Sequence, residues 1–194
     1  MQSLKLYKVL IGCKPKGRQT EQHDVFFGIA ENLQSLIPQL KAFWPEAANT
    51  MHVDAYRIIK YVDGYEVMIL PKNTKKKSEA QLYFINLGGY KPNEFEEFHY
   101  KMVVAATIKA IAIQQSKSTT FYKHTGFAKA TSHVDDKYGI DVDDIMDIGE
   151  ILHKDLKNKY TIVLKKVTKP FVEDSMHLGY FKMSKIENGT ILTY

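Results

Sequence analysis

The chain has 194 residues, of which 44% are hydrophobic and 25% are charged, a composition typical of a folded globular protein with a substantial core. A formal net charge of +5 is too small to indicate nucleic-acid binding by itself, and the single cysteine, Cys13, excludes an internal disulfide. The longest apolar run, 102–113, contains Lys109 and is too short to span a membrane, so we expect a cytoplasmic protein.

One stretch of the chain occurs twice, 76 residues apart. Residues 6–41 and 82–117 share eight identities without gaps, where chance would give about two at ordinary residue frequencies. Further on, His52-Val53-Asp54 recurs as His133-Val134-Asp135, at an offset of 81. We therefore predict one compact body made of a first repeat unit (1–71), a linker (72–80), a second repeat unit (81–166) and a C-terminal extension (167–194).

The first unit is predicted as β-α-β-β. Residues 4–12 are almost continuously apolar at their end, which indicates a central strand. We expect a helix from Thr20 to about residue 41, because acidic residues stand in its first turn and apolar residues recur at helical spacing. Residues 52–62 and 65–70 are predicted as strands joined by a hairpin turn at Asp63-Gly64.

The second unit is predicted to follow the same order, with a strand at 81–88 and a helix from a capping box at Asn93 and Glu96 to about residue 115. Fourteen residues are inserted here, and the apolar residues that follow Asp143 and Asp144 indicate an amphipathic helix with an acidic start within about 136–157. A strand at 160–165 then closes the unit. The C-terminal extension is expected to add strands around an Asn188-Gly189 hairpin turn.

These elements predict an α+β fold of two tandem β-α-β-β repeats. A pseudo-twofold axis is expected between the repeats, with helices packed on one face of a mixed or mostly antiparallel sheet.

The strongest candidate site consists of two histidines and two carboxylates in each unit: Glu21, His23, His52 and Asp54, and again Glu97, His99, His133 and Asp135. Such a set can bind a divalent metal, transfer protons, bind a ligand without chemistry, or serve only as a polar pair that supports the fold. On an ideal helix Glu21 and His23 would point about 200° apart, which argues against one shared ligand. We favour the structural role and expect no cofactor, with a divalent metal as the alternative.

A basic loop, with Lys14, Lys16 and Arg18, lies between the first predicted strand and the first predicted helix. The free amides at a helix start suit an anion, so weak binding of a small anionic ligand is one interpretation. A phosphate loop is excluded because Gly17-Arg18-Gln19 stands where the motif requires Gly-Lys-Ser/Thr. A solvated loop without a ligand is the interpretation we favour.

Several short segments of the first unit resemble the bacterial domain-of-unknown-function family 1543: Gly12-x-Lys14-Pro15, Glu21-Gln22-His23-Asp24, Pro45-Glu46-Ala47, His52-Val53-Asp54-Ala55 and Asp63-Gly64-Tyr65. The second unit is similar to it through Gly88, Lys91-Pro92, Glu97-x-His99 and His133-x-Asp135. It departs at Tyr100, where the first unit has Asp24, and at the 14-residue insertion. The resemblance implies one or two copies of this unit per chain and no known activity.

Taken together, the duplication and the absence of a complete catalytic motif favour a non-enzymatic binding or interaction module. The segregated charge allows a second copy of the chain or a small anionic ligand as partner, and we expect neither a membrane nor a nucleic acid. The alternative is a small hydrolytic or metal-assisted enzyme. In it, His23 or His99 would transfer protons, and the pair His52–Asp54 or His133–Asp135 would hold a metal or orient the proton-transferring histidine.

Overall fold

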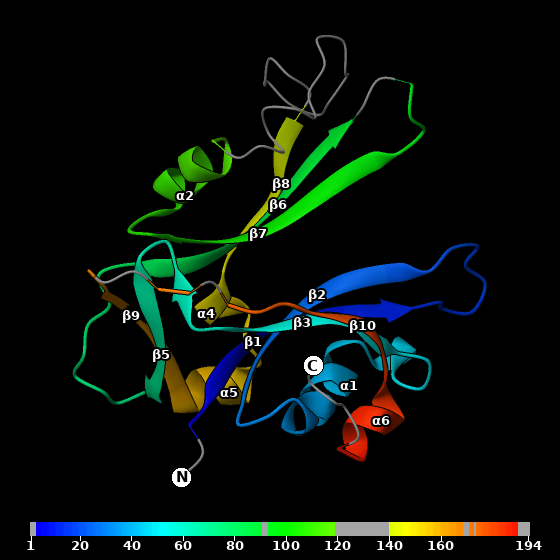
Figure 1. Ribbon diagram of the computed structural model, residues 1–194, viewed down its shortest axis with the longest axis horizontal. Coiled ribbons are helices and arrows are strands. Elements are labelled where there is room, and N and C mark those ends of the chain that lie inside the picture. Colours follow the sequence, from blue (N-terminus) through cyan, green and yellow to red (C-terminus); the bar gives the residue numbers. More distant parts are fainter. Residues whose placement is uncertain (1–2, 91–92, 119–139, 169–170, 173, 190–194) are drawn as a thin grey trace. The chain divides into compact units, whose positions relative to one another are not determined.

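The computed structural model describes residues 3–90, 93–118, 140–168, 171–172 and 174–189 (Figure 1). The chain divides into two compact units, the first formed by Met1–Lys75 with Leu152–Tyr194 and the second by Lys76–Ile151. The fold is α+β, with short helices and antiparallel pairing throughout the described sheets. No helix in the described ranges has the length and apolar character needed to cross a membrane.

A four-stranded sheet with the order β10-β3-β1-β2 forms the main layer of the first unit. Its strands are β1 (Lys5–Cys13), β2 (Gln22–Ala30), β3 (His52–Ile59) and β10 (His177–Lys182). The central place of β1 confirms the prediction from its apolar sequence.

Short helices cover one face of this sheet: α1 (Ile37–Phe43), α6 (Met183–Glu187) and the 3₁₀ turns η1 (Gln34–Leu36) and η2 (Pro45–Ala47) (Figure 1). The core between them contains every second residue of β1 together with apolar residues of the helices: Tyr7, Val9, Ile11, Cys13, Leu36, Ile37, Leu40, Met183 and Ile186. Because side chains alternate along a strand, Gly12 belongs to the opposite face of the sheet.

A smaller sheet of the first unit has the order β4-β5-β9, formed by β4 (Tyr61–Val62), β5 (Tyr65–Pro71) and β9 (Tyr160–Lys166). Asp63 and Gly64 join β4 to β5 with φ angles of 48° and 82°, which confirms the predicted hairpin turn. The strand predicted to close the second unit, β9, instead follows α5 (Lys154–Lys159) and pairs with β5 of the first unit.

The second unit contains a three-stranded sheet with the order β7-β6-β8. Its elements are β6 (Gln81–Tyr90), β7 (Glu97–Ala106), α2 (Lys109–Ser116), β8 (Ile140–Asp147) and α4 (Ile148–Ile151). The register of β6 on β7 equals that of β1 on β2 with 76 added to every number.

The predictions of two long helices from the sequence are wrong. Their first halves form β2 and β7, so each unit runs β-β-α-β rather than β-α-β-β. The reason is burial on both faces: residues 25–30 are all buried, which one face of a helix cannot achieve but a strand covered on both sides can. Residues 103–106 are likewise all buried, and Asn93 has a φ of 64°, so it does not cap a helix.

Two further local predictions are wrong. The acidic segment predicted as one helix within 136–157 instead contains the strand β8 (Ile140–Asp147), followed by the short helices α4 and α5. Asn188-Gly189 is not a hairpin turn: Asn188 caps α6, and Gly189 has the φ of 65° that is common just past a helix C-terminus.

Candidate functional site

The candidate site of the first unit is built around Gly12 on β1. Gly12 pairs with His23 on β2 and with His52 on β3, so the two histidines flank it on the same face of the sheet. Glu21 lies two residues before His23, and alternate residues of an extended chain project to the same side. The separation of about 200° expected on a helix therefore does not apply, because this segment is a strand.

Asp54 reaches the same place through an irregularity in β3. Leu10 pairs with Ala55, but Ile11 pairs with Val53, so Asp54 is an extra residue in the ladder. Such a β-bulge re-aims a side chain without ending the strand. Val53 stays in the core, and Asp54 turns toward His23 and His52.

Glu21, His23, His52 and Asp54, here called the quartet, form a closed ring in which imidazoles and carboxylates alternate. His52 Nε2 lies 2.9 Å from Glu21 Oε1 and 3.1 Å from Asp54 Oδ1. His23 Nε2 lies 3.2 Å from Asp54 Oδ2 and 3.8 Å from Glu21 Oε2. The fold thus brings together all four residues that the sequence singled out in the first unit.

The ring has a closed side and an open side. His52 is only 4% exposed, and the ring of Tyr180 from β10 lies against it with centroids 4.2 Å apart. The side chains of His23 and Glu21 are 40% and 42% exposed. His23 and Glu21 therefore form the side of the ring that reaches solvent.

Polar atoms at the closed side lack hydrogen-bond partners. Within the described part of the chain, His52 Nδ1, His52 Nε2 and Asp54 Oδ2 are buried and make no hydrogen bond. The carboxylate oxygens at 2.9 and 3.1 Å from His52 Nε2 are close enough, but their positions do not meet hydrogen-bond geometry at that nitrogen.

The ring rests directly on the backbone of Gly12. A Cβ atom at this position would collide with His52 Nε2 and Asp54 Oδ2 and would lie 2.9 Å from His52 Cε1. Any residue with a side chain would therefore displace the ring. This is a position where glycine is required by close approach rather than by backbone conformation.

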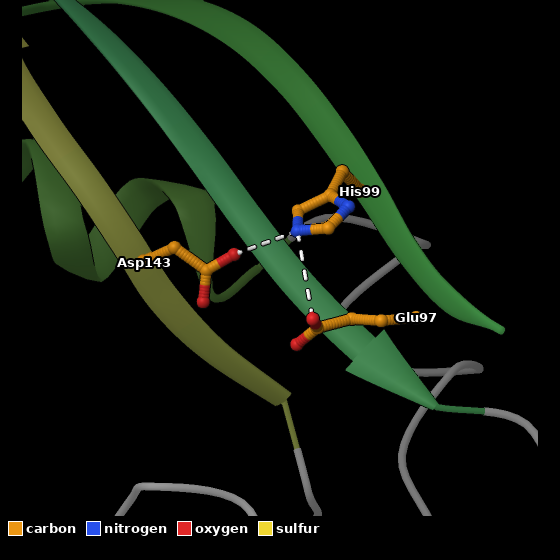
Figure 2. A group of neighbouring side chains, drawn as sticks. All are labelled: Glu97, His99 and Asp143. Atoms are coloured by element: carbon orange, nitrogen blue, oxygen red, sulfur yellow. Dashed lines mark ion pairs between the residues drawn. The ribbon is translucent and has the colours of Figure 1, made fainter. Parts of the chain in front are cut away.

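A related group lies on β7 and β8 of the second unit (Figure 2). His99 Nε2 lies 3.3 Å from Asp143 Oδ2 and 3.9 Å from Glu97 Oε2. Gly88 pairs with His99 and lies beneath Asp143, where an added Cβ would be 2.8 Å from the Asp143 Cγ. We call Glu97, His99 and Asp143 the triad.

The sequence did not identify Asp143 as a site residue. Gly88 pairs with Asp141 as Gly12 pairs with His52, and Asp143 is the bulged residue of β8 as Asp54 is of β3. Both Asp135 and Asp143 follow a valine, but only Asp135 has a histidine before that valine, as Asp54 has. The sequence pattern therefore matched Asp54 with Asp135 rather than with Asp143. His133 and Asp135 lie outside the described residues, and their role stays a prediction.

The basic side chains of Lys14, Lys16 and Arg18 are exposed in the loop between β1 and β2. The Arg18 N–H donates to the Pro15 carbonyl at 3.2 Å and so tightens this loop. Since the loop joins two strands of a hairpin, the helix start that suggested an anion site is not there. Anion binding by these three residues stays a prediction.

Comparison with known proteins agrees with this fold. The crystal structure of a protein Il1583 from Idiomarina loihiensis is similar, with a TM-score of 0.59 and 22% identity over 92% of this chain and 96% of that one. In sequence, no curated protein matches the chain. The resemblance predicted from the sequence is confirmed for the segment that holds the whole quartet: residues 18–69 match the family model described as Domain of Unknown Function (DUF1543).

Proposed function

We propose that the protein is a non-enzymatic binding module whose ligand is a divalent transition-metal ion of the Zn²⁺ type, held by the quartet. The observation that carries this proposal is the buried imidazole of His52, which has no hydrogen bond from either ring nitrogen to any described residue. Buried polar groups are almost always hydrogen-bonded, and an unpaired one costs about 1–3 kcal/mol. A metal bound to Nε2 would supply the missing partner.

The nitrogen–oxygen distances within the ring are close to those around a tetrahedral ion, and small movements of the side chains would admit one. Imidazole nitrogens and carboxylate oxygens bind Zn²⁺ at about 2.0–2.2 Å, so neighbouring ligands around one tetrahedral ion lie about 3.3–3.6 Å apart. Three of the four nitrogen–oxygen distances in the quartet are 2.9, 3.1 and 3.2 Å, somewhat shorter than this spacing, and each carboxylate presents a different oxygen to each histidine. The fourth, 3.8 Å between His23 and Glu21, joins the two most exposed side chains, which can move closer.

The donor set decides between binding and catalysis. Two imidazoles and two carboxylates suit Zn²⁺ and similar ions, and the two negative charges balance the charge of the ion. Four protein donors complete a tetrahedral shell, as in structural zinc sites, whereas catalytic zinc sites keep a position open for water. We therefore place binding ahead of the alternative, a metal-assisted hydrolase.

We also infer that the β1–β2–β3 part of the first unit and the β6–β7–β8 sheet of the second unit are copies of one unit. The inference is supported by the common register of β1–β2 and β6–β7 and by bulges at corresponding positions of β3 and β8. Each copy places a Glu-x-His pair and an aspartate above a glycine. The pseudo-twofold relation between the copies stays a prediction.

Zinc binding can be tested on full-length protein freed of its affinity tag and treated with a chelator. Isothermal titration should give a site in the wild type whose affinity falls at least 100-fold in His52→Ala and His23→Ala. His153→Ala is the matched control, because His153 Nδ1 lies 3.7 Å from Asp155 Oδ2 in another imidazole–carboxylate pair outside the quartet. Equal zinc binding by the wild type and His52→Ala would overturn the proposal.

Thermal unfolding separates this function from a purely structural role. Zinc at 100 times its Kd should stabilise the folded chain by about 2.7 kcal/mol. For a chain of this size that raises the Tm by roughly 5–10 °C. If zinc leaves the wild-type Tm unchanged, while His52→Ala lowers it by several degrees without metal, the quartet supports the fold and binds no ion.

A further inference from the structure

We infer that the triad of the second unit is a separate cation site, weaker than the quartet and selective for harder ions such as Mn²⁺. This inference does not rest on zinc binding by the quartet, because the residues and strands are different. The three donor atoms all lie within 4.8 Å of one another. In Figure 2 both carboxylates approach the same nitrogen of His99 from different strands.

The backbone and a neighbouring amide fix the Asp143 carboxylate. Its Cγ and both oxygens lie over Gly88, where a Cβ would collide with them, so the carboxylate occupies space that only glycine leaves. Asn86 Nδ2 donates to Asp143 Oδ2 at 3.4 Å. Hydrogen bonds of this kind orient carboxylates that bind metals. The contact with Asn86 would support the Asp143 carboxylate as a ligand in the same way.

Tyr90 stands next to the triad on β6. It pairs with Glu97 across the β6–β7 ladder. The corresponding residue in the first unit, 76 positions earlier, is the cation Lys14. The second unit thus offers its two carboxylates to an ion without a lysine at that position.

The donor set and exposure of the triad set its selectivity. It supplies one imidazole and two carboxylates, whose side chains are between 28% and 42% exposed. Hard cations such as Mn²⁺ prefer oxygen ligands and keep bound water, which an open site permits. The quartet supplies two imidazoles, one of them buried, and suits a softer ion. The two sites should therefore rank Zn²⁺ and Mn²⁺ differently.

Electron paramagnetic resonance of free Mn²⁺ measures this site directly in the full-length, tag-free protein. Asp143→Asn should weaken Mn²⁺ binding at least tenfold, and His99→Ala should weaken it severalfold. Asp144→Asn is the matched control: it removes the same charge from the neighbouring residue, which also accepts from Asn86 at 3.4 Å but is not part of the triad. It should change the affinity by less than twofold.

Two results would overturn the inference. One is the absence of Mn²⁺ binding by the wild type at millimolar concentration. The other is an equal loss in Asp143→Asn and Asp144→Asn, which would indicate a diffuse negative surface. His52→Ala distinguishes the two proposals, because it should lose zinc binding at the quartet and keep Mn²⁺ binding at the triad. Circular dichroism of each variant verifies that it is folded.

Discussion

Gly12→Ala is the smallest substitution that tests whether the quartet binds an ion. The new Cβ would lie 2.9 Å from His52 Cε1, whereas ordinary contacts begin at 3.4 Å, so the imidazole must retreat by at least about 0.5 Å. Metal–ligand distances tolerate only about 0.2 Å. We therefore expect zinc affinity to fall by about 10–100-fold or more, as when supporting residues of a metal site are lost.

The same substitution should have a small effect on the stability of the metal-free protein. Replacing glycine by alanine inside a strand removes unfolded-state freedom and stabilises by roughly 0.5–1 kcal/mol. This gain opposes the strain of moving His52 and Asp54. Gly28→Ala is the matched control on β2, because its Cβ would lie 2.6 Å from Phe26 Cε1 and 2.8 Å from Leu36 Cδ2 in the core. It should lower the Tm and leave zinc affinity unchanged.

Competition with a chromophoric chelator measures zinc affinity in both glycine variants, and calorimetry measures their Tm. Zinc binding by Gly12→Ala at wild-type strength would show that the quartet is not the site. A loss of Tm as large as that of Gly28→Ala, with unchanged zinc affinity in both variants, would mean that Gly12 serves packing alone.

Two further predictions use other parts of the chain. Burial raises the pKa of Asp147 in the folded protein, because the charged carboxylate is poorly solvated there. The contribution of Asp147 to stability is therefore fully present below its unfolded-state pKa and is lost as the pH rises through its folded-state pKa. Asp147→Asn, which can still accept from the Gly149 N–H, should thus be more stable than wild type at pH 7 in urea unfolding, and the difference should vanish in acid. Cys13 is fully buried, so a thiol reagent should react with it only after unfolding.

Local features of the fold could be predicted from the sequence, and features that depend on burial could not. The Asp63-Gly64 turn is local, because it needs only two residues that tolerate positive φ. The helix expected from residue 20 failed because the apolar residues within 25–30, among them Phe26 and Ile29, also fit a strand covered on both faces. Periodicity alone does not distinguish these two cases, and the pairing of β2 with β1 decides between them.

The candidate site was predictable in composition but not in geometry. The recurrence of Glu-x-His marked Glu21 and His23, and the strand pattern put His52 and Asp54 on one face. Their convergence depends on the register of three strands and on the bulge at Asp54, which no local pattern encodes. Asp143 was missed because its strand lies 89 residues after its counterpart, whereas the first two strands of the unit lie 76 residues after theirs.

The path of the chain between the two units has a consequence for biosynthesis. The chain leaves the first unit at Lys75 and returns to it at Leu152, so the strands β9 and β10 are made last. The second unit is contiguous and can finish folding on the ribosome while the first still lacks these two strands. Until they are made, β3 and β5 each present an unpaired edge, which can template aggregation. Nascent chains stalled before residue 152 should therefore depend on chaperones more than the completed protein does.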